Sequence, residues 1–360
     1  MKFFGSSVEL HCITNTPPSA LPNVTVLIPV HNGLPYLEQA LRSIMTQTLR
    51  SIEILVIDDA STDGSPGVLA RLAAEDPRIR VETLPSRYKL PRALNHGLTL
   101  ARAPLIARMD ADDIALPQRL EIQKRYMDAH PDVVLTGGGI RRIRADGSTI
   151  RETIRSNDDF AVRWLIKFRL SIAHPTWMMQ NPMLSENGLA YDPAFSVTED
   201  HEFVSRLLHH GKIVGIPALL LEYRVHDNSV TSRNWAFQTE QAEKIFDFCV
   251  QNSYPDSVLS KFGALRAAHF RRKRANSADV IAGFLAMLDH DTAHHPNRRA
   301  WLMRQGTQLI YETLRRAGYT RYGALLALLR HAPGLLTPLV LRALETQNLL
   351  PRFMDSEPAV

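Results

Sequence analysis

Two short apolar runs near the N-terminus constrain the fold more than any other feature of the sequence. Residues 24–30 (VTVLIPV) and 52–57 (IEILVI) are rich in β-branched side chains, which is typical of strands covered on both faces. Between them, residues 36–49 place apolar side chains at helical spacing after a turn at Asn32-Gly33. Strand, helix and strand in this order predict a β-α-β unit, whose two strands lie parallel in one sheet.

The same alternation continues along the chain. Helices are expected at residues 66–74 and 91–102, and strands at residues 79–84 and 105–109. Repeated units of this kind predict an α/β fold with a mostly parallel sheet flanked by helices. Ligands of such sheets bind at the carboxyl ends of the strands, so the residues that follow each strand are the most informative ones.

Beyond residue 115 the pattern becomes mixed. Helices are expected at 117–129, 160–168 and 198–210, and strands at 133–139, 176–179, 212–216 and 219–225. From about residue 234 nearly all of the pattern is helical, with breaks near residues 254–255, 294–296, 318 and 333. We therefore divide the chain into an N-terminal extension (1–22), an α/β domain (23–235) and a basic helical C-terminal region (236–360).

Positive charge is concentrated in the helical region. Residues 261–352 hold 15 Lys and Arg but five Asp and Glu, an excess of ten, whereas the whole chain carries +5. The one dense cluster is Arg271–Arg274, and Phe270 is the only aromatic residue beside it, so we expect no nucleic-acid binding. Three interpretations stay open: a solvated helix surface, a surface that makes peripheral contact with anionic lipid headgroups, or one that binds an acidic partner chain.

Cysteine content and hydropathy bear on the compartment. Cys12 and Cys249 are too far apart for a metal or disulfide motif, which favours a reducing compartment. Polar residues interrupt the first 21 positions, and charges and prolines break the apolar segment 323–341. We expect a cytoplasmic protein, peripheral on the cytoplasmic membrane face if the basic region binds lipid, with no signal peptide and no membrane-spanning helix.

Polar residues gather where three of the predicted strands end. They are Pro29, His31 and Asn32 after the first strand, Asp58 and Asp59 after the second, and Asp110, Asp112 and Asp113 after the strand at 105–109. Carboxylates crowded at one sheet edge repel one another unless a cation or hydrogen-bond donors neutralise them. Asp110 and Asp112 lie on one tight turn, a pattern suited to Mg²⁺ or Mn²⁺ whose other ligands are diphosphate oxygens.

Asp58 and Asp59 allow two interpretations. With the following Ser61, Asp63 and Gly64 they form a pattern typical of an Asx turn and a helix cap. A carboxylate at a strand end also accepts hydrogen bonds from a pyrimidine base or a ribose hydroxyl. The residues alone leave both open.

Four segments in this order carry a resemblance to a known family. They are VTVLIPVHNGLPYLEQALRSIMTQT (24–48), IEILVIDDASTDGS (52–65), ALNHGLTLARAPLIARMDADDIALPQRLEIQ (93–123) and TEDHEFVSRLLHHG (198–211). Together, over residues 23–233, the chain resembles the family 2 glycosyltransferases of the GT-A fold, a Rossmann-like fold for nucleotide-diphospho-sugar transferases. The resemblance implies an inverting enzyme that uses a nucleotide-sugar donor. It does not extend to the basic helical region.

The resemblance also implies roles for single residues. The nucleoside would be bound by Pro29, His31 and Asn32 with Asp58 or Asp59, and Asn95 would lie near the nucleotide sugar. Asp110 and Asp112 resemble the D-x-D pair that contacts the ribose and the metal-bound diphosphate. Asp113 would lie on the sugar side. His226 resembles a late histidine that completes the metal site with Asp110 and Asp112, although an ordinary polar role is equally open. Glu199-Asp200 resembles the acceptor-side motif whose Asp is the general base.

The chemistry agrees with these roles. Inversion at an anomeric carbon needs one base for the acceptor hydroxyl while the diphosphate leaves from the opposite face, and Asp200 would supply that base. At a helix N-terminus the helix dipole favours an anionic Asp200. Asp200 as an ordinary helix-terminal acid, and Glu199 as the base, stay open. His174 and Trp177 either shape the acceptor site or pack against the neighbouring strand. Lys89 and Arg92 either contact a phosphate group of the donor or are solvated surface charges.

The sequence therefore predicts a metal-dependent inverting glycosyltransferase. The donor is a UDP-sugar and the acceptor a hydroxyl of a glycan or lipid-linked saccharide, in cell-surface polysaccharide synthesis. Two alternatives remain: a nucleotidyltransferase of related fold, and a catalytically inactive carbohydrate-binding scaffold.

Overall fold

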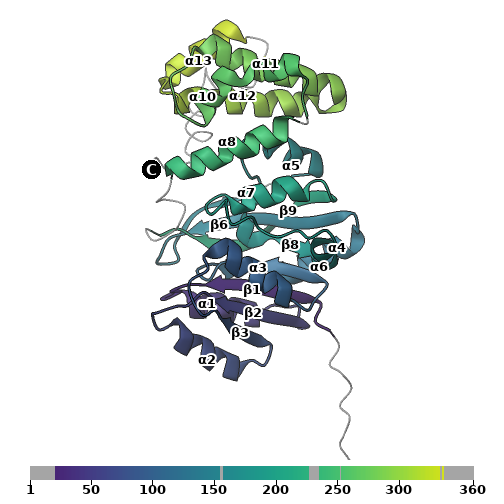
Figure 1. Ribbon diagram of the computed structural model, residues 1–360, viewed down its shortest axis with the longest axis vertical. Coiled ribbons are helices and arrows are strands. Elements are labelled where there is room, and N and C mark those ends of the chain that lie inside the picture. Colours follow the sequence, from purple (N-terminus) through teal and green to yellow (C-terminus); the bar gives the residue numbers. More distant parts are fainter. Residues whose placement is uncertain (1–20, 155–156, 227–234, 252, 333–334, 336–360) are drawn as a thin grey trace, which may run out of the picture.

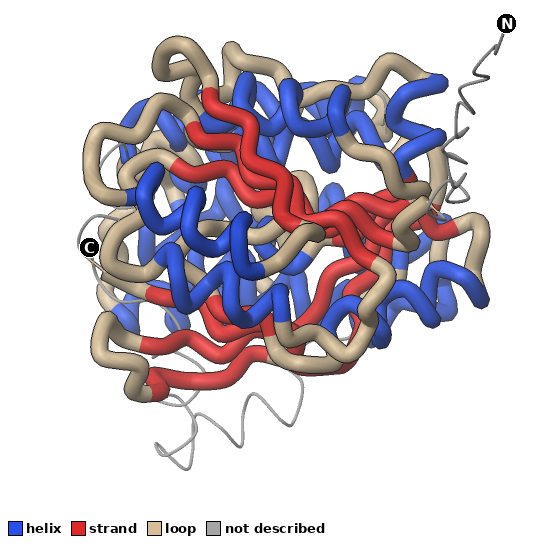
Figure 2. The backbone as a smooth tube through the Cα atoms, turned by 90° about the horizontal axis from the view of Figure 1, so that it is seen from below, coloured by secondary structure: helices blue, strands red, loops and turns tan. Residues whose placement is uncertain are grey.

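The computed structural model describes residues 21–154, 157–226, 235–251, 253–332 and 335. Expectations for residues 1–20, Cys12 among them, and for the break near residue 333 lie outside these described residues. The described chain forms a strongly twisted sheet with helices against it and a helical region beyond one side (Figure 1). Figure 2 shows helices on both faces of the sheet.

One sheet unites the strands of the described residues. The strands are β1 (Val24–Val30), β2 (Ile52–Asp58), β3 (Ile79–Thr83), β4 (Leu105–Arg108), β5 (Ile114–Ala115), β6 (Val133–Ile143), β7 (Thr149–Thr153), β8 (Met178–Gln180) and β9 (Lys212–Arg224). Their order is β3-β2-β1-β4-β8-β6-β9-β5, and β7 pairs with β6. The first four strands of this order are parallel, so their carboxyl ends meet at one edge.

Helices connect these strands and then form the helical region. Those before residue 210 are α1 (Leu37–Met45), α2 (Ser65–Glu75), α3 (Leu90–Leu100), α4 (Arg119–Ala129), α5 (Asp159–Leu165), α6 (Asn181–Glu186) and α7 (Glu199–Leu207), with the short 3-10 helix η1 (His174–Thr176). Those after it are α8 (Trp235–Gln251), α9 (Asp256–Leu259), α10 (Phe262–His269), α11 (Ser277–His294), α12 (Arg299–Arg316) and α13 (Arg321–His331), with η3 (Pro296–Arg298). The α/β architecture and the helical C-terminal region expected from the sequence are confirmed.

Strands β5 and β7 and helix α6 lie in segments where the sequence predicted no element, and two predicted regions differ from the structure. The strands expected at 212–216 and 219–225 are one strand, β9, because its register with β6 shifts between Gly138 and Gly139 and lets residues 217–218 bulge out. Pro217, which cannot donate a hydrogen bond to a partner strand, lies in that bulge. The strand expected at 176–179 is replaced by η1 followed by β8.

Alternate side chains of the central strands fill two cores. On one face Val26 and Ile28 of β1 pack in a cluster with Leu41 of α1. On the other face Leu27 packs with Leu94 of α3 and lies in the same cluster as α7. Since every residue of β1 and β2 is buried, the sheet is covered on both sides, as their continuous apolar runs predict.

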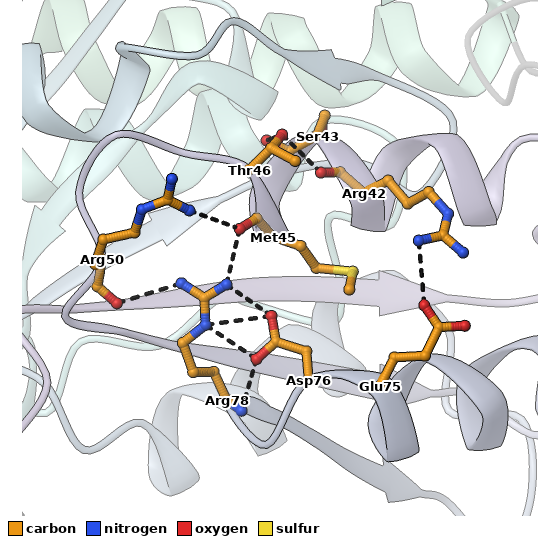
Figure 3. A network of polar contacts seen from close by, with 8 residues as sticks. All are labelled: Arg42, Ser43, Met45, Thr46, Arg50, Glu75, Asp76 and Arg78. Carbon is orange, nitrogen blue, oxygen red and sulfur yellow. Dashed lines mark hydrogen bonds and ion pairs between the residues drawn. The ribbon is translucent and has the colours of Figure 1, made fainter.

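The edge of the sheet at the amino ends of the strands is closed by Arg78. Its guanidinium contacts both carboxylate oxygens of Asp76 and donates to the backbone oxygens of Met45 and Arg50 (Figure 3). These bonds tie the end of α1 to the starts of β2 and β3. The residues predicted to bind the donor follow β1, β2 and β4, at the opposite edge, where these parallel strands have their carboxyl ends.

The helical region shares a core with the sheet domain. Trp164 of α5 and Phe168 lie in one buried cluster with Phe246 of α8 and Phe284 of α11. Within the described residues, no helix combines the length and the apolar character that crossing a membrane requires. Helix α8 (Trp235–Gln251) packs against α7.

Candidate active site

Loops at the carboxyl ends of β1, β2 and β3 are bonded to one another. The Asn32 side-chain oxygen accepts hydrogen bonds from the backbone of Thr62 and Asp63, and Nδ1 of His31 lies 2.8 Å from the backbone oxygen of Asp59. The carboxylate of Asp59 in turn accepts from the backbone amides of Tyr88 and Lys89. The three loops thus form one continuous rim.

This rim places the predicted nucleoside residues together. Pro29 is buried in β1, opposite Ile57 of β2. Asp58 is 1% exposed and accepts a hydrogen bond from the Ser61 amide, which is the Asx-turn arrangement considered from the sequence. Lys89 and Arg92 are exposed beside the rim.

The acidic turn after β4 forms a compact cluster. One carboxylate oxygen each from Asp110, Asp112 and Asp113 lies within 4.8 Å of the others. Asp113 is 1% exposed: Oδ1 accepts a hydrogen bond from the Arg224 amide, and Oδ2 has no hydrogen-bond partner. An unpartnered buried carboxylate oxygen beside two further carboxylates is an arrangement that a hard cation would satisfy.

Two buried arginines lie behind this cluster. Both terminal nitrogens of Arg108, which is 2% exposed, contact the carboxylate of Asp110 at 2.8 and 2.6 Å. The fully buried Arg119 donates to the backbone oxygen of Arg108. Burial raises the pKa of Asp110, and the charge of Arg108 opposes that rise. Burial and the neighbouring carboxylates raise the pKa of Asp113 well above its usual range.

His226 contacts the same cluster from the far end of β9. Its Nε2 lies 2.9 Å from Oδ2 of Asp112, and its ring packs on that of Tyr36, with 5.4 Å between the ring centroids. The guanidinium of Arg224 lies 4.4 Å from the Tyr36 ring centroid and donates to the backbone oxygen of Asp112. Four residues were predicted at the metal and the sugar. Asp110, Asp112 and Asp113 form the cluster, called the acidic triad below, and His226 contacts it.

Helix α7 carries the predicted catalytic pair. Glu199 is buried, with Oε1 3.9 Å from Nδ1 of His174, whereas Asp200 is partly exposed and accepts from the His201 amide. Burial raises the pKa of Glu199 to about 8. The charge of Asp200 adds to the rise in the pKa of Asp110 that burial causes, which places α7 and the acidic turn in one electrostatic neighbourhood.

Burial acts on the pKa of Asp200 against the expected effect of the helix dipole. The sequence analysis expected the helix dipole to favour the anionic carboxylate, which would lower its pKa. Burial instead raises the pKa of Asp200, and the nearby His201 and Arg108 only partly offset this effect. Removing a carboxylate from water outweighs the favourable field of one helix N-terminus.

Asn95 and the aromatic residues near α7 have packing partners. Both polar atoms of the Asn95 amide bond to the backbone of Tyr191, at 2.8 and 2.7 Å. The Tyr191 hydroxyl lies 2.9 Å from Nε2 of His174. Trp177 is fully buried and stacks near Phe203, which supports its packing role rather than contact with an acceptor.

Comparison with known sequences agrees with this architecture. The sequence profile described as glycosyl transferase family 2 matches residues 25–184. The chain is 30% identical over 222 residues to the O-antigen biosynthesis glycosyltransferase WbnJ of Escherichia coli, covering 60% of this chain and 85% of that protein. The chain belongs to glycosyl transferase family 2. This glycosyltransferase is also 28% identical over 199 residues to the amylovoran biosynthesis glycosyltransferase AmsE of Erwinia amylovora, covering 55% of the chain and 73% of AmsE.

Solved structures show the same fold. Staphylococcus aureus TarS (residues 1–349), in a crystal structure with UDP-GlcNAc, matches this family 2 glycosyltransferase with a TM-score of 0.56 and 18% identity. The match covers 82% of this chain and 88% of the TarS chain. The GT-A type of fold expected from the sequence is therefore confirmed, and at this level of identity the likeness concerns the fold alone.

The sequence analysis did not identify the arginine side chains that lie beside the acidic turn. Arg108 interrupts the apolar run LIARM at 105–109, and a charge inside a buried strand is a signal for a paired group. Arg119 and Arg224 gave no such signal, because each lies in a segment with polar neighbours. Arg119 binds the backbone oxygen of Arg108, and Arg224 binds that of Asp112. The sequence of this family 2 glycosyltransferase does not show these pairs, because they depend on how β4, α4 and β9 are arranged in the fold.

Proposed function

We propose that this glycosyltransferase moves a sugar, with inversion, from a UDP-sugar to a hydroxyl of a glycan or lipid-linked saccharide, in cell-surface polysaccharide synthesis. The observation that carries the proposal is the acidic triad Asp110, Asp112 and Asp113 directly after β4, near enough to Asp200 that the charge of Asp200 contributes to the raised pKa of Asp110. We assign this site to the α/β domain, residues 23–235, and treat residues 236–360 as a separate helical region, whose helix α8 packs against α7. WbnJ and AmsE, named for O-antigen and amylovoran biosynthesis, support the polysaccharide context.

Donor binding is assigned to the bonded rim. His31 and Asn32 with Asp58 or Asp59 would face the nucleoside, since their loops are joined at the carboxyl ends of β1 and β2. Pro29 is buried in β1 just before them and would contribute through the backbone that leads into this loop. Asn95 would support the donor site without binding the donor through its side-chain amide, because both polar atoms of that amide are hydrogen-bonded to the Tyr191 backbone. The UDP and UDP-GlcNAc complexes of TarS support a uridine nucleotide as the donor group.

The residues present fit a divalent cation, Mg²⁺ or Mn²⁺. Asp112 and Asp110 with His226 would hold it, and the unpartnered Oδ2 of Asp113 faces the same cluster. Such a cation supplies positive charge that stabilises a diphosphate leaving group. Arg108 fixes the orientation of Asp110, whose carboxylate retains lone pairs for a second contact.

Asp200 is the general base in this proposal. It is partly exposed while Glu199 is buried, so Asp200 is the carboxylate that an acceptor hydroxyl reaches. A pKa raised by burial strengthens it as a base while it accepts the hydroxyl proton. Glu199 is buried beside His174, with Oε1 3.9 Å from Nδ1, and is not assigned the role of base.

Donor hydrolysis tests this function. Purified full-length protein is incubated with UDP-sugars and Mn²⁺ or Mg²⁺, and UDP release is measured. Slow release that needs the cation supports the proposal, and D112N should lower it by at least a hundredfold. The nucleotidyltransferase alternative predicts pyrophosphate release from a nucleoside triphosphate instead, and the named glycosyltransferase relatives give it no support. A protein that binds a saccharide but releases no UDP would favour the scaffold alternative.

The basic helical region gives a second proposal, contact with anionic lipid at the cytoplasmic membrane face. Arg271–Arg274 are all exposed on the connection between α10 and α11, although Arg271 also pairs with Glu243. The variant R272S/K273S/R274S should bind phosphatidylglycerol vesicles more weakly than the control R50S/R125S/K212S, which removes equal charge elsewhere. Equal binding by both variants would contradict a specific contact.

A further inference from the structure

Gln241 of α8 bridges the helical region and the helix that carries the proposed base. It is 3% exposed, and both ends of its amide are engaged. Oε1 accepts a hydrogen bond from the hydroxyl of Thr198 at 3.1 Å, and Nε2 donates to the backbone oxygen of Ala194 at 2.6 Å. A buried amide satisfied at both ends fixes the segment it contacts, because loss of either partner leaves a polar group unpaired.

The residues that Gln241 contacts lie at the start of α7. Thr198 is the N-cap residue of that helix, but its hydroxyl forms no capping bond and is donated to Gln241 instead. Glu199 and Asp200 follow directly. The orientation of the first turn of α7 is therefore set from α8 rather than by a local cap.

A second contact holds the same turn from another side. His201, 6% exposed, has its Nε2 against the backbone oxygen of Ile166, at the end of α5. Trp164 of α5 donates to Asp291 of α11, and its ring lies in the core that contains Phe246 of α8. Asp200 thus lies between two residues that are both bonded to other elements: Thr198 to Gln241 of α8, and His201 to Ile166 at the end of α5, a helix whose Trp164 and Leu165 pack in the core shared with the helical region.

We propose that the helical C-terminal region positions the catalytic base, and that Gln241 is the positioning residue through which α8 acts. The proposal rests on the function proposed above. A base must lie within hydrogen-bond reach of the proton that it removes, and a displacement of about 1 Å costs up to about a hundredfold in rate. An amide that fixes both Thr198 and Ala194 limits such displacement.

A purely structural role makes a different prediction. If Gln241 only filled space between α7 and α8, methionine, which has a similar volume and shape, would replace it at little cost. Thr198→Val likewise keeps the shape of the side chain and removes only the hydroxyl. These two variants therefore separate hydrogen-bonded positioning from packing.

The experiment compares Q241M, T198V and the double variant with the wild type and with Q251M. Gln251 lies exposed at the end of the same helix and serves as the matched control. For each protein, kcat and the donor KM are measured by UDP release with Mn²⁺, the thermal midpoint is measured, and amide hydrogen exchange is followed over residues 192–202. All measurements use the full-length chain.

The expected result is a roughly tenfold to hundredfold lower kcat for both single variants, with donor KM within about twofold of the wild type. The double variant should be no slower than the slower single one, and exchange at residues 192–202 should rise. Values of kcat and of amide exchange in Q241M equal to those of the wild type would overturn the inference. A lower kcat would also overturn it if the thermal midpoint is lower as well and kcat returns to the wild-type value when the assay is cooled, because the loss would then come from unfolding. An inactive wild type would defeat the proposed function instead, and the exchange data would then decide whether Gln241 holds this segment.

Discussion

Nε2 of His226 lies 2.9 Å from Oδ2 of Asp112, although 114 residues separate them in the sequence. The contact joins the end of β9 to the acidic turn after β4, and it adds an imidazole to a cluster of three carboxylates. Tyr36 of the first loop supports the imidazole from its other side. Three distant segments thus converge on one site.

This contact makes His226 testable as a cation ligand. H226A removes one neutral nitrogen donor, so we expect Mn²⁺ to bind about tenfold to a hundredfold more weakly to the variant. Isothermal titration of Mn²⁺ in the presence of UDP measures this change. H130A, which changes an exposed histidine at the C-terminal end of α4, is the control. Equal Mn²⁺ affinity in H226A and wild type would contradict the assignment.

Replacing Asp200 should separate chemistry from binding. D200N keeps the shape of the side chain but removes the base, so we expect kcat to fall by about 10² to 10⁴ while the affinity for UDP stays within twofold. E199Q should reduce kcat less, because Glu199 is buried away from an acceptor. A larger loss in E199Q than in D200N would transfer the role of base to Glu199.

Arg108 is buried and pairs with the partly exposed carboxylate of Asp110, so disruption of this ion pair has a predictable pattern. R108M leaves that carboxylate without its counter-charge, and because water still reaches it the cost should be about 1 to 3 kcal/mol in the free energy of unfolding. Adding D110N should recover much of that stability, since the unpaired charge is gone, but it should not recover UDP release. Urea unfolding and UDP release measure the two effects, and a double variant as unstable as R108M would show that the pair is not the cause.

His269 makes the stability of the helical region depend on pH. The imidazole is buried between α10 and α12, where Nδ1 lies 2.7 Å from the Thr313 hydroxyl, and burial lowers its pKa from 6.5 to about 3. The folded state binds fewer protons than the unfolded state between these values, so this stabilisation is full above pH 6.5 and is lost as the pH falls toward 3. The expected slope from this residue is about 1.4 kcal/mol per pH unit.

The measurement compares urea unfolding of wild type and H269Q from pH 7 to pH 4. Glutamine keeps a polar side chain but does not titrate, so the variant should show a shallower fall in stability over this range. Parallel curves for the two proteins would mean that His269 does not control the acid sensitivity. H295Q, an exposed histidine after α11, is the matched control.

The sequence alone determined the α/β fold and the places where polar residues leave the sheet. The runs at 24–30 and 52–57 became β1 and β2 with little change, because seven consecutive buried residues demand cover on both faces. The acidic turn was visible for the same local reason: Asp110, Asp112 and Asp113 follow directly on a buried strand. The spacing of residues along the chain is sufficient to predict features that depend on a single strand or helix and the loop that follows it.

Only the tertiary structure decided which partners these residues have. Arg108 neutralises Asp110, Asn95 binds the Tyr191 backbone, and Gln241 holds Thr198, and the sequence gives no local sign of the last two pairs. The raised pKa of Asp200 also follows from burial, which depends on what packs over α7 and not on its position in a helix. Burial and pairing are properties of the assembled fold, because the groups that remove water or supply a counter-charge come from distant parts of the chain.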